Sequence, residues 1–301
     1  MISLSAENVS KYYGEMIAID NISLKAEAGK IFGFLGPNGA GKTTTIRMLV
    51  GITAPDTGKI EFLGQPLSSE SQYRIGYLPE ERGLYRKVNI QGQLRYFAAL
   101  KGISRSEADK RIDFWLARVN LSEWKLKKPD ELSKGMQQKI QFVSTVLHNP
   151  ELLILDEPFS GLDPVNVENL LEIIEELKLQ GKTIIFSTHL METAEKLCDD
   201  LILINKGKKI LGGTIRQVKA RSDKNLILLR CAGGENVIRD KTLVDKVINH
   251  ADEHEILLSA NVNPGQFLRK LLDNNAEISK FERIEPSLNS IFIEKVRESN
   301  A

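Results

Sequence analysis

The stretch that decides the fold is residues 31–43, IFGFLGPNGAGKT. Its first part, residues 31–35, is an apolar run that predicts a buried parallel strand. The remainder, residues 36–43, fits the pattern G-x-x-x-x-G-K-[ST], and a helix-forming segment starts near Lys42. A strand, a glycine-rich turn and a helix in this order predict a loop whose N–H groups bind phosphate at a helix N-terminus.

Two side chains of this loop have predicted roles in nucleotide binding. Lys42 can reach the β- and γ-phosphates, and the Thr43 hydroxyl can ligate Mg²⁺. The alternative, a glycine-rich turn that fits the pattern by chance, is disfavoured by the strand before it and the helix after it. The expected phosphate-binding residues are Gly36, Pro37, Asn38, Gly39, Ala40, Gly41, Lys42, Thr43 and Thr44.

A second apolar run ends in two carboxylates. Residues 152–155 are followed directly by Asp156 and Glu157. Ligands of open α/β folds bind at the carboxyl ends of the strands, so Asp156 is placed to hold Mg²⁺, directly or through water. Glu157 is then the candidate general base for an attacking water. Such a pair alone is more often an ordinary loop start, and the phosphate loop upstream favours the functional interpretation.

The rest of the chain predicts an α/β protein with a parallel-sheet core, an antiparallel β subdomain and a helical subdomain. Residues 2–26 alternate with period two, which predicts antiparallel strands. Residues 89–148 show helical periodicity, and two buried strands around 152–155 and 183–187 flank a helix over 165–180. Beyond residue 205 the expected elements are strands at 225–231, 254–260 and 278–284, and helices at 242–250, 264–274 and 288–296. They form a small α+β domain, 221–301, after a first domain of residues 1–220, with the boundary near 221–224.

Composition excludes several classes of protein. Lys and Arg total 41 against 40 Asp and Glu, so no basic surplus points to nucleic acid. Two cysteines without metal-like spacing predict neither a disulfide framework nor a zinc site. The apolar runs fall short of the ~18 residues of a spanning helix, and the start of the chain does not resemble a signal peptide. We therefore expect a cytosolic protein whose link to any membrane comes through a partner.

Further motifs resemble those of the ABC transporter ATPases. The segment LSKGMQQK, residues 132–139, is similar to their signature segment, and SGLDP, residues 160–164, to their D-loop. Thr188-His189 resembles the switch histidine, and Tyr13 matches the aromatic residue that stacks on adenine. The resemblance covers about residues 1–215 and implies the P-loop NTPase fold of the ABC ATPases.

The resemblance also implies roles for individual residues. Ser133 and Gly135 would face the γ-phosphate bound to a second subunit, with Asp163 of the D-loop beside the nucleotide. His189 would bind the γ-phosphate and Glu157, so that Lys42, Glu157 and His189 are the catalytic residues. Taken alone, Ser133 is more often an N-cap, His189 a structural histidine and Tyr13 a core or surface aromatic.

Three positions depart from the common form of the family. Lys134 and Met136 stand where the signature usually has glycine and glutamine, although Gly135 is kept. In the segment GYLPEER, residues 76–82, Glu80 takes the place of the expected Q-loop glutamine. Glu80 can still hold Mg²⁺ or water, but it adds negative charge beside the phosphates. Residues 76–85 and the trailing α+β domain resemble the ATPases of sodium-extrusion and drug-resistance exporters.

The resemblance implies an ATP-binding and ATP-hydrolysing subunit of an ABC transporter of exporter type, with ATP and Mg²⁺ as cofactors. The implied partners are a separate membrane permease and a second ATPase subunit in a head-to-tail homodimer or heterodimer, without nucleic acid. The subunit would lie on the cytoplasmic side of the cell membrane, and its cargo would be a sodium ion or a drug-like hydrophobic compound. Two alternatives fit less well. A soluble ABC ATPase acting on DNA or the ribosome usually has two cassettes or a coiled coil, and a P-loop kinase lacks the signature and D-loop segments.

Overall fold

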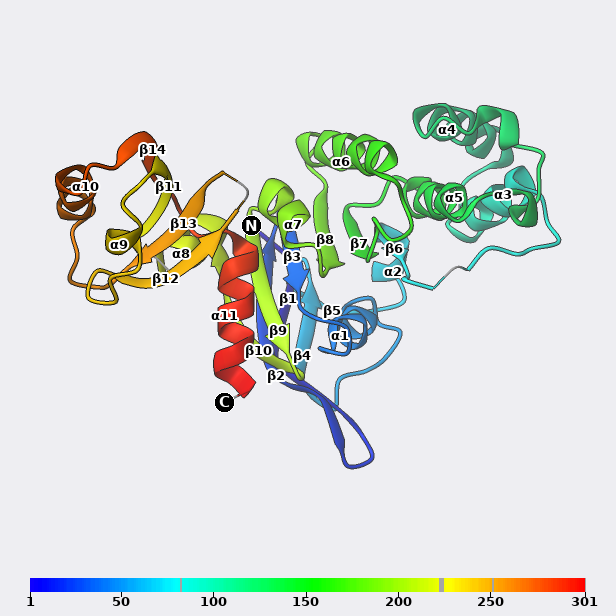
Figure 1. Ribbon diagram of the computed structural model, residues 1–301. Helices are drawn as coiled ribbons and strands as arrows, with labels where there is room; N and C mark the ends of the chain where they lie inside the picture. Colours follow the sequence, from blue (N-terminus) through cyan, green and yellow to red (C-terminus); the bar gives the residue numbers. More distant parts are fainter. Residues whose placement is uncertain (82, 222–224, 251, 301) are drawn as a thin grey trace. The chain divides into compact units, whose positions relative to one another are not determined.

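The computed structural model describes residues 1–81, 83–221, 225–250 and 252–300. It divides into two compact units, Met1–Ile215 and Arg216–Ala301, which are shown in Figure 1 and are described here one at a time. Of the expected boundary at 221–224, residues 222–224 lie outside the described part. The units divide earlier, within helix α8 (Ile215–Arg221), because this helix belongs with the second unit: Lys219 pairs with Glu285 at 3.7 Å.

The centre of the first unit is a six-stranded sheet. All strands run parallel except β10, which pairs antiparallel with β9, as expected for a P-loop core. Its parallel register places Leu35 opposite Thr188 and Asp156 opposite Ser187, so the carboxyl ends of three strands meet at one edge. In spatial order the strands are β10 (Lys208–Thr214), β9 (Asp200–Asn205), β3 (Ile31–Leu35), β8 (Thr183–Thr188), β7 (Leu152–Asp156) and β6 (Ile75–Leu78).

An antiparallel sheet shares a core with these strands, as the period-two pattern predicts. Its order is β2 (Met16–Glu27), β1 (Ile2–Tyr13), β4 (Thr57–Phe62) and β5 (Gln65–Pro66). One continuous cluster of buried side chains includes members of this sheet, of the parallel sheet and of helix α1 (Lys42–Leu49). Burial of these side chains holds the phosphate loop, which lies between β3 and α1, against both sheets.

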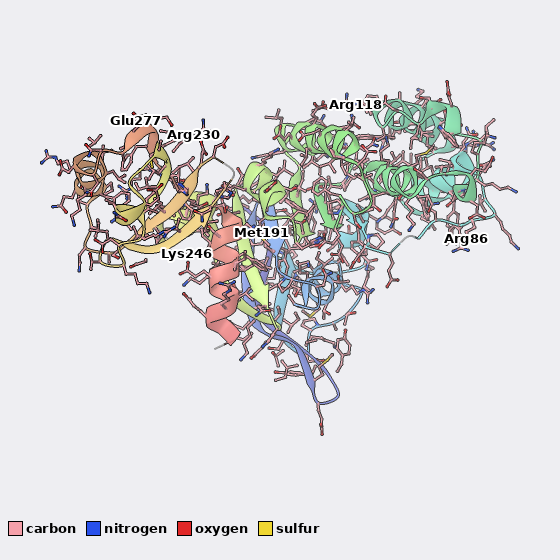
Figure 2. The ribbon with its side chains drawn as sticks, in the orientation of Figure 1. Arg86, Arg118, Met191, Arg230, Lys246 and Glu277 are labelled. Carbon is pink, nitrogen blue, oxygen red and sulfur yellow. The ribbon has the colours of Figure 1, made fainter. Side chains whose placement is uncertain are left out.

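Helices form the remainder of the first unit. They are α2 (Ser71–Arg74), α3 (Ile90–Leu100), α4 (Arg105–Arg118), α5 (Lys134–Val146), α6 (Pro164–Leu179) and α7 (Met191–Leu197). Short 3₁₀ turns, Ser122–Trp124 and Pro129–Glu131, lie between α4 and α5. Arg118, labelled in Figure 2, forms an ion pair with Glu176 and so connects α4 to α6. No helix in the described part of the chain is long and apolar enough to cross a membrane.

The second unit is an antiparallel sheet with its own core. The strand order is β12 (Val244–Asn249), β13 (His254–Leu258), β11 (Leu226–Ala232) and β14 (Glu277–Arg283); Arg230, Lys246 and Glu277 of this sheet are labelled in Figure 2. Its helices after α8 are α9 (Glu235–Ile238), α10 (Pro264–Asp273) and α11 (Leu288–Asn300). Side chains such as Ile227, Ile256 and Phe267 are fully buried in one cluster.

The expected helix over residues 242–250 is wrong. These residues contain the edge strand β12, whose pairing with β13 shifts register between Val244 and Lys246. The resulting bulge lets Val244 and Val247 both pack on the core although they are three residues apart. That spacing is typical of a helix face, which explains the error.

Candidate active site

The phosphate loop folds tightly because two glycines lie against other strands. A Cβ at Gly36 would approach the Ile204 carbonyl oxygen to 2.5 Å. Gly41, with φ +103°, would bring a Cβ within 2.5 Å of Ile19 Cδ1. The turn between β9 and β10 is hydrogen-bonded to the phosphate loop: the Gly207 N–H donates to the Ala40 carbonyl oxygen at 2.9 Å.

The same turn connects the loop to the antiparallel sheet. The Gly207 carbonyl accepts a hydrogen bond from the Asp20 N–H of β2 at 2.9 Å. Backbone hydrogen bonds thereby join three segments that are far apart in the sequence: β2, the phosphate loop and the β9–β10 turn.

A cavity of about 340 Å³ lies over the phosphate loop. The structure brings together here most of the residues that the sequence predicts, together with residues that sequence reasoning missed, namely Met16, Ile17, Ala18, Lys206 and Gly207. Tyr13 does not line the cavity, but it lies opposite Met16 in the β1–β2 hairpin and its side chain is 49% exposed. The predicted residues that do line it are Pro37, Asn38, Gly39, Gly41, Lys42, Thr43, Thr44, Glu80 and Glu157.

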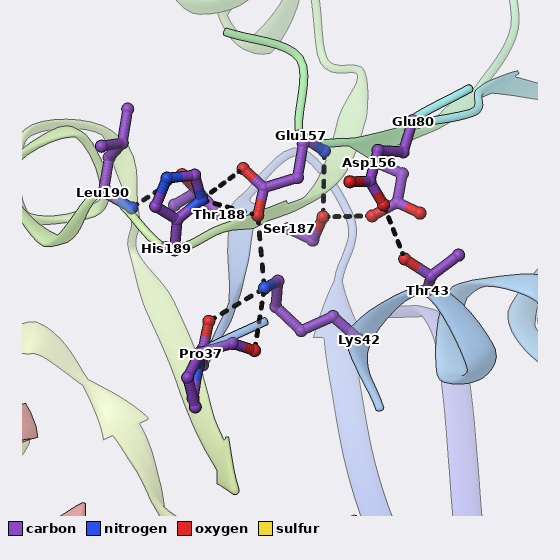
Figure 3. Close-up of polar contacts among 11 residues, drawn as sticks. Pro37, Lys42, Thr43, Glu80, Asp156, Glu157, Ser187, Thr188, His189 and Leu190 are labelled. Atoms are coloured by element: carbon purple, nitrogen blue, oxygen red, sulfur yellow. Dashed lines mark hydrogen bonds and ion pairs between the residues drawn. The ribbon is translucent and has the colours of Figure 1, made fainter. Parts of the chain in front are cut away.

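Lys42 is the central cation of this cavity. Its side chain is buried, and its Nζ donates to the carbonyl oxygens of Gly36 at 2.9 Å and Pro37 at 3.3 Å (Figure 3). The same Nζ lies 3.3 Å from Glu157 Oε1. The ammonium group is therefore held over the loop that would bind the phosphates.

Glu157 has an unusual backbone conformation. Its φ is +48°, in the left-handed region, which costs a residue with a side chain roughly 1–2 kcal/mol. In this conformation the buried carboxylate meets Lys42 on one side and His189 on the other, with both carboxylate oxygens 3.1 Å from His189 Nδ1. A carboxylate aimed over a phosphate loop and backed by a histidine has the geometry of a general base with its positioning partner.

Asp156, beside it, is completely buried. One carboxylate oxygen, Oδ1, accepts a hydrogen bond from the Ser187 hydroxyl, and Oδ2 has no hydrogen-bond partner among the described residues. Burial raises the pKa of Asp156 above its ordinary value; the Ser187 hydrogen bond and the nearby Thr43 hydroxyl oppose that shift, while Glu80 and Glu157 add to it. An orphaned buried oxygen in a cluster of carboxylates fits a hard cation such as Mg²⁺.

Glu80 belongs to this cluster. The Thr43 hydroxyl donates to Glu80 Oε2 at 3.2 Å, so Glu80, Thr43 and Asp156 offer oxygen ligands at one point. In the described part of the chain no three His, Cys, Asp or Glu side chains form a metal cage by themselves. Mg²⁺ usually keeps waters and takes substrate phosphates with only one or two carboxylates. The metal role of Thr43, Asp156 and Glu80 stays a prediction.

Replacing Asp156 by asparagine tests this assignment. Because the variant keeps the shape of the side chain and loses its charge, we expect the Mg²⁺ concentration for half-maximal ATP binding to rise about tenfold or more. Nucleotide binding in EDTA should stay within about twofold. Asp199→Asn is the matched control, since Asp199 accepts from the Ile31 N–H at the opposite end of β3. Equal Mg²⁺ dependence in the Asp156 variant and the wild type would contradict the assignment.

The signature and D-loop residues lie elsewhere. Ser133 is the N-cap of α5, and its Oγ accepts from the Met136 N–H at 3.2 Å, which confirms the capping interpretation. Asp163 caps α6 through the Asn166 N–H. A Cβ at Gly135 would lie 3.2 Å from the Gly161 carbonyl oxygen, so the two motifs adjoin each other. None of these residues lines the cavity over the phosphate loop.

Sequence reasoning also missed Ser187. Its side chain is fully buried and bonds to both Asp156 and Glu157. The available signal is a hydroxyl at the end of an otherwise apolar strand, residues 184–186, that neighbours the carboxylate strand in a βαβ unit.

The parallel sheet, the phosphate loop and the two carboxylates define a nucleotide-binding protein of the P-loop class. Comparison with known protein families narrows this class. Residues 19–160 match the ABC transporter family model, and residues 213–296 match the C-terminal domain of the DrrA1-3-like ATP-binding proteins.

Individual relatives agree with the family models. The chain is 44% identical to the ABC transporter ATP-binding protein YhaQ of Bacillus subtilis (strain 168), over 97% of this chain and 98% of the relative. It is 33% identical to the linearmycin resistance ATP-binding protein LnrL of the same organism, over 96% of this chain and 97% of the relative. A solved ATP-binding subunit of an ABC transporter superposes with a TM-score of 0.69 at 32% identity, covering 74% of this chain and 93% of that one. The chain belongs to the ABC transporter ATP-binding proteins, with the C-terminal domain of the DrrA-like members.

Proposed function

We propose that this ATP-binding subunit hydrolyses MgATP in a site that a second ATPase subunit completes, and that hydrolysis drives a separate membrane permease of exporter type. One observation carries the proposal. Lys42, Glu157 and His189 converge over the phosphate loop, whereas Ser133 and Gly135 lie outside the cavity formed by the same chain.

The site within one chain is therefore half of the proposed site. Ser133 is exposed at the N-terminus of α5, a helix of 13 residues whose first-turn N–H groups and dipole favour an anion. A head-to-tail pair related by a twofold axis would place this terminus of each subunit over the phosphate loop of the other. A homodimer and a heterodimer with a related ATPase satisfy the geometry equally.

In the proposed mechanism Lys42 and the loop N–H groups bind the β- and γ-phosphates, while the exposed ring of Tyr13 offers a stacking face for adenine. Glu157 accepts a proton from the attacking water as the water oxygen bonds to the γ-phosphorus and the bond from that phosphorus to the β–γ bridging oxygen breaks, so that ADP leaves. His189 holds the Glu157 carboxylate in position. Mg²⁺, when bound by Thr43 and Asp156 with Glu80, supplies positive charge to the phosphates.

Export and cargo are supported by the family rather than by the site. The relative named for linearmycin resistance aligns with 96% of this chain, which includes both units, and this favours a drug-like hydrophobic compound over a sodium ion. We place the subunit at the cytoplasmic face of the membrane, bound peripherally through the permease. Vesicles that contain the permease and this chain should accumulate a hydrophobic drug with ATP; accumulation of ²²Na⁺ alone would indicate the other cargo.

Nucleotide-dependent dimerisation tests the shared site. Without nucleotide the wild-type chain should sediment as a monomer, because half of each site is missing in one subunit. Glu157→Gln with MgATP should sediment as a dimer, since the bound ATP is no longer hydrolysed and the ATP-bound dimer does not dissociate. Ser133→Glu in the Glu157→Gln background should restore the monomer, because a carboxylate at this helix terminus repels the partner's phosphate. A Glu157→Gln monomer at saturating MgATP would exclude the homodimer and leave a heterologous ATPase as the partner to be tested.

A further inference from the structure

We propose that Ser187 is a positioning residue for ATP hydrolysis, whose single hydroxyl fixes both the Asp156 carboxylate and the Glu157 backbone. The inference rests on the proposed function and adds to it a residue that belongs to none of the family motifs discussed above.

The geometry connects three buried residues at the edge of the parallel sheet. Ser187 lies opposite Asp156 in the register of β7 and β8. Its hydroxyl donates to Asp156 Oδ1, and its Oγ accepts from the Glu157 N–H at 3.0 Å (Figure 3). The Ser187 hydroxyl thus donates one hydrogen bond, to Asp156, and accepts another, from the Glu157 N–H.

The first bond orients the Asp156 side chain. Because Oδ1 is engaged by Ser187, Oδ2 is the oxygen that has no hydrogen-bond partner in the described part of the chain. Asp156 is completely buried, so the Ser187 hydroxyl and not bulk solvent satisfies Oδ1. Loss of the bond would free the carboxylate to rotate away from the direction in which a metal ligand is needed.

The second bond fixes the peptide group that leads into Glu157. The Glu157 N–H points at Ser187 Oγ, and a buried N–H without an acceptor is unfavourable. The residue that follows this peptide group has φ at +48°, in the left-handed region. Strained backbone persists only where surrounding contacts determine it. Ser187 supplies such a contact, and the result is a carboxylate within 3.3 Å of Lys42 and 3.1 Å of His189.

Strand formation alone does not require a serine here. Residues 184–186 of β8 are Ile, Ile and Phe, all fully buried, and a fully buried strand position favours such residues over serine. The hydroxyl is explained by its two partners and not by the strand.

The test compares Ser187→Ala with the conservative Ser187→Thr. We expect Ser187→Ala to lower kcat about tenfold or more and to raise the Mg²⁺ concentration for half-maximal activity by a similar factor. ATP affinity in EDTA should stay within about twofold, because the phosphate loop is untouched. Ser187→Thr keeps the hydroxyl and should recover most of kcat; Ser187→Cys, with nearly the volume of serine and a weak donor, should fall between.

The matched control is Thr183→Ala. Thr183 is buried at the other end of β8, and its hydroxyl accepts from the Gly29 N–H at 3.1 Å. The control variant loses a comparable buried hydrogen bond, and its unfolding temperature should fall as that of Ser187→Ala does, while its kcat and Mg²⁺ dependence should match the wild type.

Several outcomes would overturn the proposal. One is a Ser187→Ala enzyme with kcat and Mg²⁺ dependence within twofold of wild type; another is equal loss of kcat in the Thr183 control. Loss of ATP affinity in EDTA by Ser187→Ala would show a general structural role instead. If the wild type itself fails to hydrolyse ATP, the proposed function fails. The role of Ser187 can then be tested separately by the Mn²⁺ affinity of the protein–nucleotide complex, measured by electron paramagnetic resonance. An unchanged Mn²⁺ affinity in Ser187→Ala would refute that role.

Discussion

Lys42→Ala should abolish useful ATP binding. Lys42 Nζ is the cation that the structure holds over the phosphate loop, through the Gly36 and Pro37 carbonyl oxygens. A charge-assisted contact of this kind contributes about 1.5 kcal/mol or more, so the affinity should fall by at least an order of magnitude. Removal of the lysine also takes from Glu157 the cation that lies 3.3 Å from its Oε1, and leaves His189 as the side-chain partner of this buried carboxylate among the described residues. Equilibrium titration with a fluorescent ATP analogue measures the change.

Lys30→Ala is the matched control for this prediction. Lys30 precedes β3, at the end opposite to the phosphate loop, and pairs with Glu27 at the surface. Its removal changes the net charge of the chain by the same amount, and ATP affinity should stay unchanged. An affinity of Lys42→Ala within about twofold of wild type would mean that the phosphates bind elsewhere.

Glu157→Gln should separate ATP binding from hydrolysis. Glutamine keeps the shape of the side chain and loses the basic oxygen. General-base catalysis contributes about 10²–10⁴-fold, or roughly 3–5 kcal/mol of barrier, so turnover should fall by that factor. ATP affinity should stay level or rise, because bound ATP is no longer consumed. Steady-state phosphate release and nucleotide titration on the same preparation give the two numbers.

A rate above about half of wild type would remove Glu157 from the role of general base. The structure then ranks the next candidates. Glu80 lines the cavity and accepts from the Thr43 hydroxyl. The Glu81 side chain is 89% exposed and pairs with Arg47 at 3.9 Å, so Glu80 would be tested first.

The phosphate loop and the carboxylate strand could be predicted from the sequence because their signals are local. A strand, a turn and a helix within residues 31–49 carry their own periodicity and glycine spacing. The same holds for residues 152–157, where the change from apolar to acidic marks the carboxyl end of a strand. Local signals of this kind survive folding, since the neighbours that determine them are adjacent in the chain.

What the sequence could not show depends on register between strands. That Asp156 lies opposite Ser187 is a property of β7 and β8 after pairing, and nothing local to either segment states it. The bulge in β12 is similar: one shift of register against β13 changes which side chains face the core, and the apolar spacing then indicates the wrong element. The contributions of Met16 and Lys206 to the nucleotide cavity are equally long-range.

The hydrogen bonds of Gly207 to Ala40 and to Asp20 bear on the order in which the site forms during synthesis. A nascent chain that has emerged only through β8 already contains the phosphate loop, both carboxylates and Ser187, but its loop lacks the support of the β9–β10 turn. Because a domain generally folds as a unit, we expect the nucleotide site to become complete only in the final step, in which β9 and β10 close the edge of the sheet beside β3. We expect ATP to stabilise that step more than the earlier ones.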